Sequence, residues 1–332
     1  MSFLKKILKE TAKDYTFGSL ADAPGNLPTG PLRGNSVYLN VFLRSMRIVN
    51  VRSGWSKFYP VVHSHISIPH LAGQVAEFQV VTSPSHLSEL DSNHLDRIIS
   101  LNHRLLGPIP YRGGDLNLEI GLFSVKSQDL AKPFLSVLET MALAAGVSYV
   151  SVAMPFVGPL KKGLELLTGS NDITLEIGIS TSLNNPEAGT FYVMRAASGE
   201  VKTEDIKITR EFRLVDKSNQ NVAAYPYFVF SIEPTAVRDD WFLIPEIAAT
   251  HTDLRDAVRN GQQNQIDDLF AAFRRTVLTS PDLLSADAKR LVSEVHDELV
   301  ATVPTGMTSD AARDLRPLKS IPLFGTTGSS EE

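Results

Sequence analysis

The eleven residues DLNLEIGLFSV (115–125) decide the fold class of this chain. Leucine or isoleucine occupies every second position from Leu116 to Leu122, so one side of the segment is apolar. A period of two is that of a β-strand with one buried face. A second segment, DITLEIGISTS (172–182), repeats the frame D-x-x-L-E-I-G and predicts a second strand. The shared frame leaves an internal duplication open, although eleven residues are too few to establish a repeat.

Similar segments occur on both sides of these two strands. From their alternation and their β-branched and aromatic content we expect further strands at 37–51, 58–68, 76–82, 191–197, 206–215 and 225–233. The stretch 88–106 has helical spacing instead and is expected to be a helix. Because strands follow strands without regular βαβ alternation, the domain at 37–233 is predicted to be β-sandwich-like.

A charge-free run, TMALAAGVSYVSVAMPFVGPL (140–160), separates the two LEIG strands. About 20 apolar residues in a helix are enough to span a bilayer, and such a run is also typical of a buried core helix. Prolines and glycines dilute the hydrophobicity of this run, and a proline inside a helix ends or kinks it. We therefore predict a buried helical hairpin at 133–168. Insertion of 134–168 into a membrane is the alternative.

The region after the sandwich changes from strand to helix spacing. Amphipathic helices are predicted at 240–303, and a flexible tail rich in small residues at 304–332. The predicted fold class is therefore α+β, with a β-sandwich-like body, an inserted hydrophobic helical hairpin and a C-terminal helical region.

The N-terminal residues 1–17 predict an amphipathic helix, which a Gly/Pro-rich linker at 18–36 separates from the first strand. Such a helix docks on its own domain, on a partner or on an anionic membrane surface. The residues expected to contact a membrane or a partner are Phe3, Leu4, Lys5, Lys6, Ile7, Leu8 and Lys9. Because the linker weakens coupling to the core, we expect this segment to be dispensable for folding and needed for localisation or partner binding.

Composition excludes several classes of site. The 332-residue chain has no cysteine, which rules out disulfides, thiol catalysis, iron–sulfur clusters and cysteine-ligated zinc. A net charge of −5 gives no overall basic field, so no nucleic-acid partner is expected. The N-terminus lacks the pattern of a secretion signal, which favours a cytoplasmic protein, either free or peripheral on the inner face of the membrane.

Familiar catalytic and cofactor motifs are absent from the sequence: there is no GxSxG, GxxxxGK[ST], HExxH or GxGxxG. The adjacent carboxylates Asp239 and Asp240 are interpreted as part of a salt-bridged surface corner, and Asp267 and Asp268 as a solvated helix face. We predict no catalytic residue, no cofactor and no enzyme activity.

Histidine is the reactive residue that clusters, since six of the eight histidines lie between His63 and His103. His63 and His65 fall on one face of a predicted strand, which is a workable pair for zinc, and His70 lies just beyond them. No third ligand stands at a recognised spacing. The prediction is therefore that no metal binds, with His63, His65 and His70 as the candidate ligands if this is wrong.

The segment FVGPLKKGLELLTG (156–169) and the strand after it, together with YFVFSIE, RDDW and LTSPDLLSADAKRL further on, resemble parts of uncharacterised bacterial proteins encoded in conflict or anti-phage loci. The resemblance spans about residues 115–300, implies an interaction or defence component, and carries over no site residue.

Two functions follow as expectations. The first is non-catalytic binding to a protein partner, in which the chain is a scaffold component. The second is association with, or permeabilisation of, an anionic membrane by the 1–17 helix and the 134–168 hairpin. The sequence does not indicate the identity of the partner or the oligomeric state.

Overall fold

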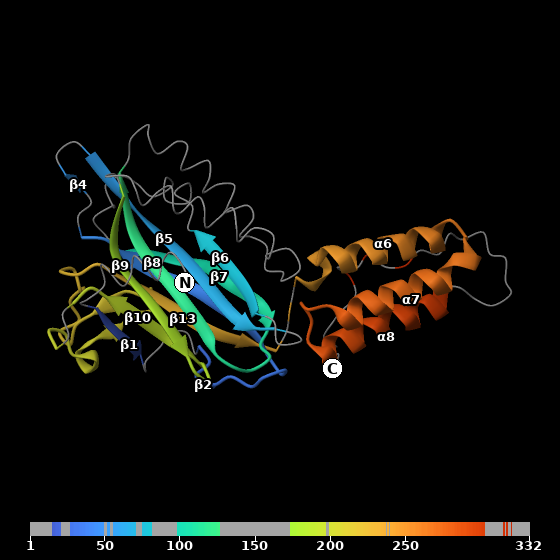
Figure 1. Ribbon diagram of the computed structural model, residues 1–332, viewed down its shortest axis with the longest axis horizontal. Helices are drawn as coiled ribbons and strands as arrows, with labels where there is room; N and C mark the ends of the chain where they lie inside the picture. The colour runs from blue at the N-terminus through green and yellow to red at the C-terminus, as the bar shows by residue number, and fades with distance from the viewer. Residues whose placement is uncertain are drawn as a thin grey trace, which may run out of the picture.

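The computed structural model describes residues 15–20, 27–49, 52–53, 56–70, 75–81, 98–126, 173–196, 199–236, 238, 240–302, 315, 317 and 320. Within these ranges the chain forms two main antiparallel sheets followed by three helices, which confirms the predicted α+β class. The sheets lie together at one end of the long axis of the molecule and the helices at the other (Figure 1).

The first sheet has the strand order β1-β10-β13-β3-β7, with every pair antiparallel. Its strands are β1 (Thr16–Leu20), β10 (Glu187–Met194), β13 (Tyr227–Thr235), β3 (Tyr38–Arg47) and β7 (Ile99–Pro110), and the short β2 (Gly30–Pro31) also pairs with β10. In the ladder with β13, Leu43 is opposite Phe230 and Ser45 is opposite Val229, so Arg44 is an extra residue in β3. Such a bulge changes the direction of a side chain.

The second sheet has the order β4-β5-β8-β9, and β6 pairs with the C-terminal half of β5. Its strands are β4 (Arg52–Ser53), β5 (Ser56–Pro69), β6 (Val75–Val81), β8 (Leu116–Lys126) and β9 (Ile173–Leu183). The two LEIG segments are antiparallel neighbours, with Gly121 directly opposite Gly178. Their shared frame therefore places matching residues at the centre of one strand pair.

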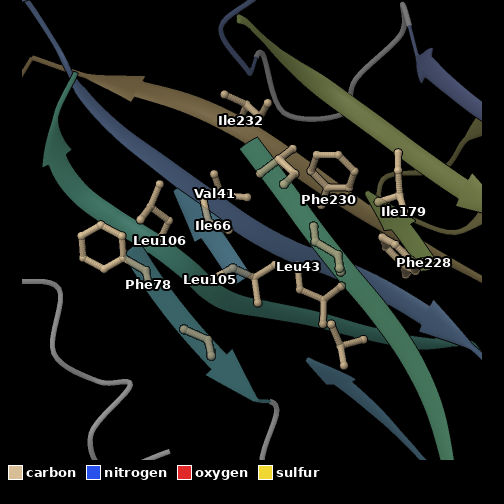
Figure 2. Close-up of a cluster of buried hydrophobic side chains, with 14 of the residues drawn as sticks. Val41, Leu43, Ile66, Phe78, Leu105, Leu106, Ile179, Phe228, Phe230 and Ile232 are labelled. Atoms are coloured by element: carbon tan, nitrogen blue, oxygen red, sulfur yellow. The ribbon is translucent and has the colours of Figure 1, made fainter. Parts of the chain in front are cut away.

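The two sheets pack face to face over one hydrophobic core, which both of them supply. Figure 2 shows the side chains of this core between the layers, and those that it labels are Val41, Leu43, Ile66, Phe78, Leu105, Leu106, Ile179, Phe228, Phe230 and Ile232. Fully burying one such side chain stabilises the fold by about 1.5 to 3 kcal/mol. This core is the physical basis of the predicted sandwich.

A smaller apolar cluster lies on the outer face of the first sheet, where residues 201–225 cover Tyr192, Met194 and Val229. This covering segment contains β11 (Lys207–Ile208) and β12 (Leu214–Val215), which pair with each other. The single strand predicted at 206–215 is therefore a hairpin. Its turn is closed by hydrogen bonds between Thr209 and Arg213, and Phe212 has a positive φ of 58°.

The helical unit contains α6 (Pro245–Arg259), α7 (Gln263–Thr279) and α8 (Ser285–Thr302). Each helix contributes an apolar face to a core of its own, in which Leu254, Phe273 and Leu291 are fully buried. Leu315, from the predicted tail, is also buried in this core. In the part of the chain that the structure describes, no helix combines the length and the apolar character that crossing a bilayer requires.

Two further sequence-based predictions are wrong. The helix expected at 88–106 is replaced from Ile99 onward by β7, because pairing with β3 outweighs a helical spacing that is weak over this stretch. The linker expected at 18–36 includes most of β1 and all of β2, which both pair with β10. Local composition did not reveal β1 and β2, because their common partner β10 lies more than 150 residues away in the sequence.

Several predictions lie outside the described residues. These are the hairpin at 133–168 and the contact residues from Phe3 to Lys9. They remain predictions.

Candidate functional site

The predicted histidine pair lies on β5, on the face of the second sheet that points away from the core. His63 and His65 alternate along the strand with residues such as Ile66, which belongs to the core. His70 follows the end of β5, and its pKa is lowered by burial and by the charge of Arg112. The structure thus brings two of the three predicted residues to one face and places the third apart from them.

His65 lies between two carboxylates that the sequence did not single out. Its Nε2 is 3.5 Å from Glu77 Oε2 on β6, and its Nδ1 is 3.8 Å from Glu119 Oε2 on β8. Burial alone would lower the pKa of His65, but the hydrogen bond and charge of Glu119, together with the charge of Glu77, outweigh it and raise this pKa. The imidazole therefore joins three neighbouring strands electrostatically.

His63 differs, because its side chain is almost completely buried. Burial and the charge of His65 lower its pKa to about 4, so the ring is neutral at pH 7. Neither ring nitrogen reaches a hydrogen-bond partner among the described residues, although Gln79 lies near enough to offset part of the effect of burial. No group of three or more metal-ligating side chains forms within the described ranges. The two carboxylates are on opposite sides of the His65 ring and cannot share one ion with it.

A different surface, which sequence reasoning missed, gathers arginine and phenylalanine on the outer face of the first sheet. We call it the arginine surface, and its members are Phe42, Arg44, Arg104, Arg210, Phe212 and Arg213. They come from β3, from β7 and from the turn at 209–213. Ser100 and Ser45 hold this turn against the sheet, because their hydroxyls donate to the carbonyl oxygens of Glu211 (2.7 Å) and Phe212 (2.5 Å).

Arg44 is the buried centre of the arginine surface. Its Nε donates to Ser231 Oγ at 2.8 Å, and its two terminal nitrogens donate to Asn102 Oδ1 and Glu233 Oε1. Glu233 neutralises its charge, and planar guanidinium groups hold such polar partners in a fixed geometry. Arg44 is therefore an anchor rather than a group available to a ligand.

The same guanidinium group orders two aromatic rings. Its central carbon is 4.6 Å from the centroid of the Phe42 ring and 4.9 Å from that of Phe212. Arg104, opposite Phe42 in the β3–β7 ladder, approaches the Phe42 ring to 5.5 Å. Contacts between cations and aromatic faces contribute about 0.5 to 1 kcal/mol at exposed sites. This stacking restrains the exposed Arg104 side chain.

The exposed part of the arginine surface is positively charged. Arg104, Arg210 and Arg213 are exposed, although the chain as a whole carries a net charge of −5. Glu211 lies between the two turn arginines, and a hydrogen bond from Thr209 with the charges of Arg213 and Arg210 lowers its pKa. Restrained guanidinium groups suit carboxylate or phosphate ligands. The signal for this surface in the sequence was Arg44, a charged residue inside the strand predicted at 37–51. Its position did not reveal which side chains it would contact.

A second polar cluster joins the sandwich to the helical unit. The Tyr38 hydroxyl, at the start of β3, donates to Asp287 Oδ2 at 2.6 Å and accepts from the Leu284 N–H at 3.1 Å. Burial raises the pKa of both Tyr38 and Asp287. Arg112 adds a hydrogen bond of 3.4 Å to the Leu283 carbonyl. We call this cluster, together with Arg238, the joint.

Arg238 is the most deeply buried charge of the joint. It is fully buried, its Nε is 2.7 Å from Asp240 Oδ1, and its Nη1 donates to the Asp282 carbonyl at 2.9 Å. The predicted salt-bridged corner therefore includes a real ion pair, but its arginine lies in the interior rather than at the surface. Asp282 is also fully buried. Breaking such a pair is strongly destabilising. Arg238 therefore fixes the segment after β13 to the connection between α7 and α8, and Tyr38 ties the sandwich to α8.

Comparisons with models of protein families, with curated proteins and with solved structures found no match.

Proposed function

We propose that this chain is a non-catalytic protein-binding component that engages a protein partner through the arginine surface. The observation that supports it most directly is the exposed guanidinium group of Arg104, which stacks on Phe42 beside the buried Arg44. Arg210 and Arg213 are also exposed, on the turn that Ser45 and Ser100 hold against the sheet. Arginine and aromatic residues are enriched at the energetic centres of protein interfaces. Restraining these side chains before binding reduces the entropy lost on association.

The joint supports a scaffold role within the same proposal. A scaffold must hold two contact regions in a constant arrangement, and the buried contacts of Tyr38 with Asp287 and Leu284 connect the sandwich to the helices. A partner bound to the first sheet would then stand in a defined position relative to α6, α7 and α8 (Figure 1).

Affinity capture from cell extract tests the proposal with three forms of the full chain. The double variant Arg104→Glu/Arg213→Glu reverses charge on the arginine surface. The control Arg274→Glu/Arg275→Glu makes the same change at exposed positions of α7. We expect a partner that the wild type and the control retain and that the double variant loses. Equal recovery of the same proteins by all three forms would overturn the proposal.

The cellular setting is also a proposal. The resemblance of residues 115–300 to proteins of conflict loci supports a place in a bacterial antiviral defence system, in the cytoplasm. Peripheral association with an anionic membrane, or its permeabilisation, is the alternative, supported by the basic 1–17 segment and the charge-free run at 140–160. Flotation with anionic liposomes, with dye release measured in the same sample, separates the two. Flotation lost on deletion of residues 1–14 would favour the membrane.

A further inference from the structure

We propose that the partner presents an extended acidic segment, whose carboxylates bind the arginine surface at two ends that are about four residues of extended chain apart. This inference rests on the proposed function, because it names the chemistry of the partner that the surface would hold. Arg104 on β7 forms one end, and Arg210 and Arg213 on the turn at 209–213 form the other. Positive guanidinium groups at both ends complement negative charge on the partner.

The three exposed arginines at these ends have positive charge to offer a partner. Within the described ranges, none of them forms an ion pair with a carboxylate of the chain. Arg44 differs, because Glu233 neutralises it. Glu211 is held by Thr209 in its own turn and offsets only one of the three charges. An excess of positive charge therefore faces solvent here, although the chain as a whole is negatively charged.

The two ends are separated along β7. The turn is fixed at one of them, because the Ser100 hydroxyl donates to the Glu211 carbonyl oxygen at 2.7 Å. Arg104 is four residues further along the same strand, and at about 3.3 Å per residue this is roughly 13 Å. The Arg104 guanidinium lies over Phe42, directly opposite in the ladder, so it does not extend along β7 towards the turn. A segment that contacts both ends must therefore be extended.

The centre of the arginine surface, between these ends, carries no net charge. Arg44 and Glu233 neutralise each other there, and the Phe42 and Phe212 rings beside Arg44 are half-buried. A carboxylate placed over the centre would be repelled by Glu233, whereas a small uncharged residue would not. The fitting segment therefore carries acidic residues at its two ends and uncharged residues between them.

A peptide fits this surface better than a single-stranded nucleic acid. Sequence-tolerant binding of single strands relies on aromatic rings that are free to stack on bases. Here the guanidinium groups of Arg44 and Arg104 lie over Phe42, and that of Arg44 also lies over Phe212. A nucleic acid would also place a phosphate at every nucleotide, including those over the centre. The rings therefore orient arginines, and the exposed arginines remain for carboxylates.

The test uses a labelled six-residue peptide with two glutamates at each end and one glycine and one serine between them. Binding to the full chain is followed by fluorescence anisotropy at low salt. We expect binding to the wild type, an affinity at least about fivefold weaker for Arg104→Glu and for Arg213→Glu, and a change of less than about twofold for the control Arg274→Glu. All three positions are exposed, so each variant should keep the wild-type melting temperature.

Two further peptides separate this arrangement from simple charge attraction. A peptide of the same composition with its four glutamates together in the middle keeps the charge but not the spacing, so it should bind at least about threefold more weakly. A peptide with lysine in place of glutamate should bind only the double variant Arg104→Glu/Arg213→Glu.

Three outcomes would each overturn the inference. These are no binding of the spaced glutamate peptide, equal binding of the peptide with grouped glutamates, and tighter binding of a thymidine hexanucleotide than of the spaced peptide. If capture of a partner from cell extract were still lost in the double variant Arg104→Glu/Arg213→Glu, the proposed function would stand without this inference.

Discussion

His63 and His65 are two residues apart on one face of β5, yet their environments shift their pKa values in opposite directions. His65 is flanked by Glu77 and Glu119, which stabilise its protonated form, and its pKa is raised. His63 is buried beside that charge, and its pKa is lowered to about 4. Both residues are histidines on the same face of one strand, so the neighbouring side chains cause the difference between their pKa values.

Replacing His63 by leucine should make the protein less sensitive to acid. An unfolded histidine titrates near 6.5, so between pH 6.5 and 4 the unfolded state binds a proton that folded His63 does not. Wild-type stability is therefore lost as pH falls through this window, by about 2 kcal/mol at pH 5. Urea unfolding at pH 5 and pH 8 measures the effect. Between pH 8 and pH 5, the free energy of unfolding of His63→Leu should fall by about 2 kcal/mol less than that of the wild type. An equal fall in the two proteins would contradict the lowered pKa of His63.

His65→Gln should change the pH dependence in the opposite direction. Because the folded pKa of His65 is raised, its contribution to stability is fully present below pH 6.5 and is lost as pH rises through the folded pKa. In the same urea experiment, the substitution should therefore lower the free energy of unfolding most at pH 5 and least at pH 8. A larger cost at pH 8 would show that the carboxylates do not stabilise the protonated ring.

Gly107 is a position where no other residue fits the backbone. Its φ is +98°, and an added Cβ would be 2.2 Å from the Leu39 carbonyl oxygen on β3. Gly107→Ala should lower the free energy of unfolding by at least about 2 kcal/mol, from backbone strain and the displaced strand. Denaturant titration measures this loss of free energy. A loss below about 0.5 kcal/mol would mean that β3 shifts to accommodate the added Cβ with little strain.

At the scale of elements, β1 changes the interpretation of the N-terminus. Phe17 stacks with Phe191 at 5.9 Å and with Phe230 at 6.5 Å between ring centroids. The segment at 1–17, expected to be dispensable for folding, therefore includes the beginning of a sheet strand. Any recruitment role must lie in the residues before β1.

Two truncations separate these roles. Deleting residues 1–20 removes β1 and should lower the free energy of unfolding by a few kcal/mol, with about 2 of these from Phe17. Deleting residues 1–14 leaves β1 intact and should keep the melting temperature if the segment does not dock on its own domain. Thermal unfolding measures both, and equal melting temperatures for the two truncations would show that β1 contributes nothing.

At the scale of the whole molecule, the joint decides whether the sandwich and the helices behave as one body. The Tyr38 hydroxyl bonds to Asp287 and to the Leu284 N–H, and both contacts are buried. A substitution here acts on the connection without disturbing the core of either part.

Tyr38→Phe should loosen the helical unit. The Asp287 carboxylate and the Leu284 N–H, both buried, then lose the hydroxyl as a partner. Each loss costs about 1 to 3 kcal/mol. Hydrogen exchange in α7 and α8 should quicken, while exchange in β8 should stay unchanged. Tyr225→Phe is the matched control, because it removes a hydroxyl whose bond to Glu200 is exposed. Equal effects of the two substitutions would show that the joint does not couple the parts.

The sequence by itself determined the strands with clear alternation, the helical character of 240–303 and the pairing of His63 with His65 on one face. These depend on periodicity, a property of neighbouring residues that tertiary contacts reinforce. It did not determine β1 and β7, whose formation depends on distant partners. The arginine surface and the joint were likewise decided only by tertiary structure. Arg44 meets Glu233 across the sheet and Tyr38 meets Asp287 across two folding units, and no local pattern encodes a contact between residues so far apart.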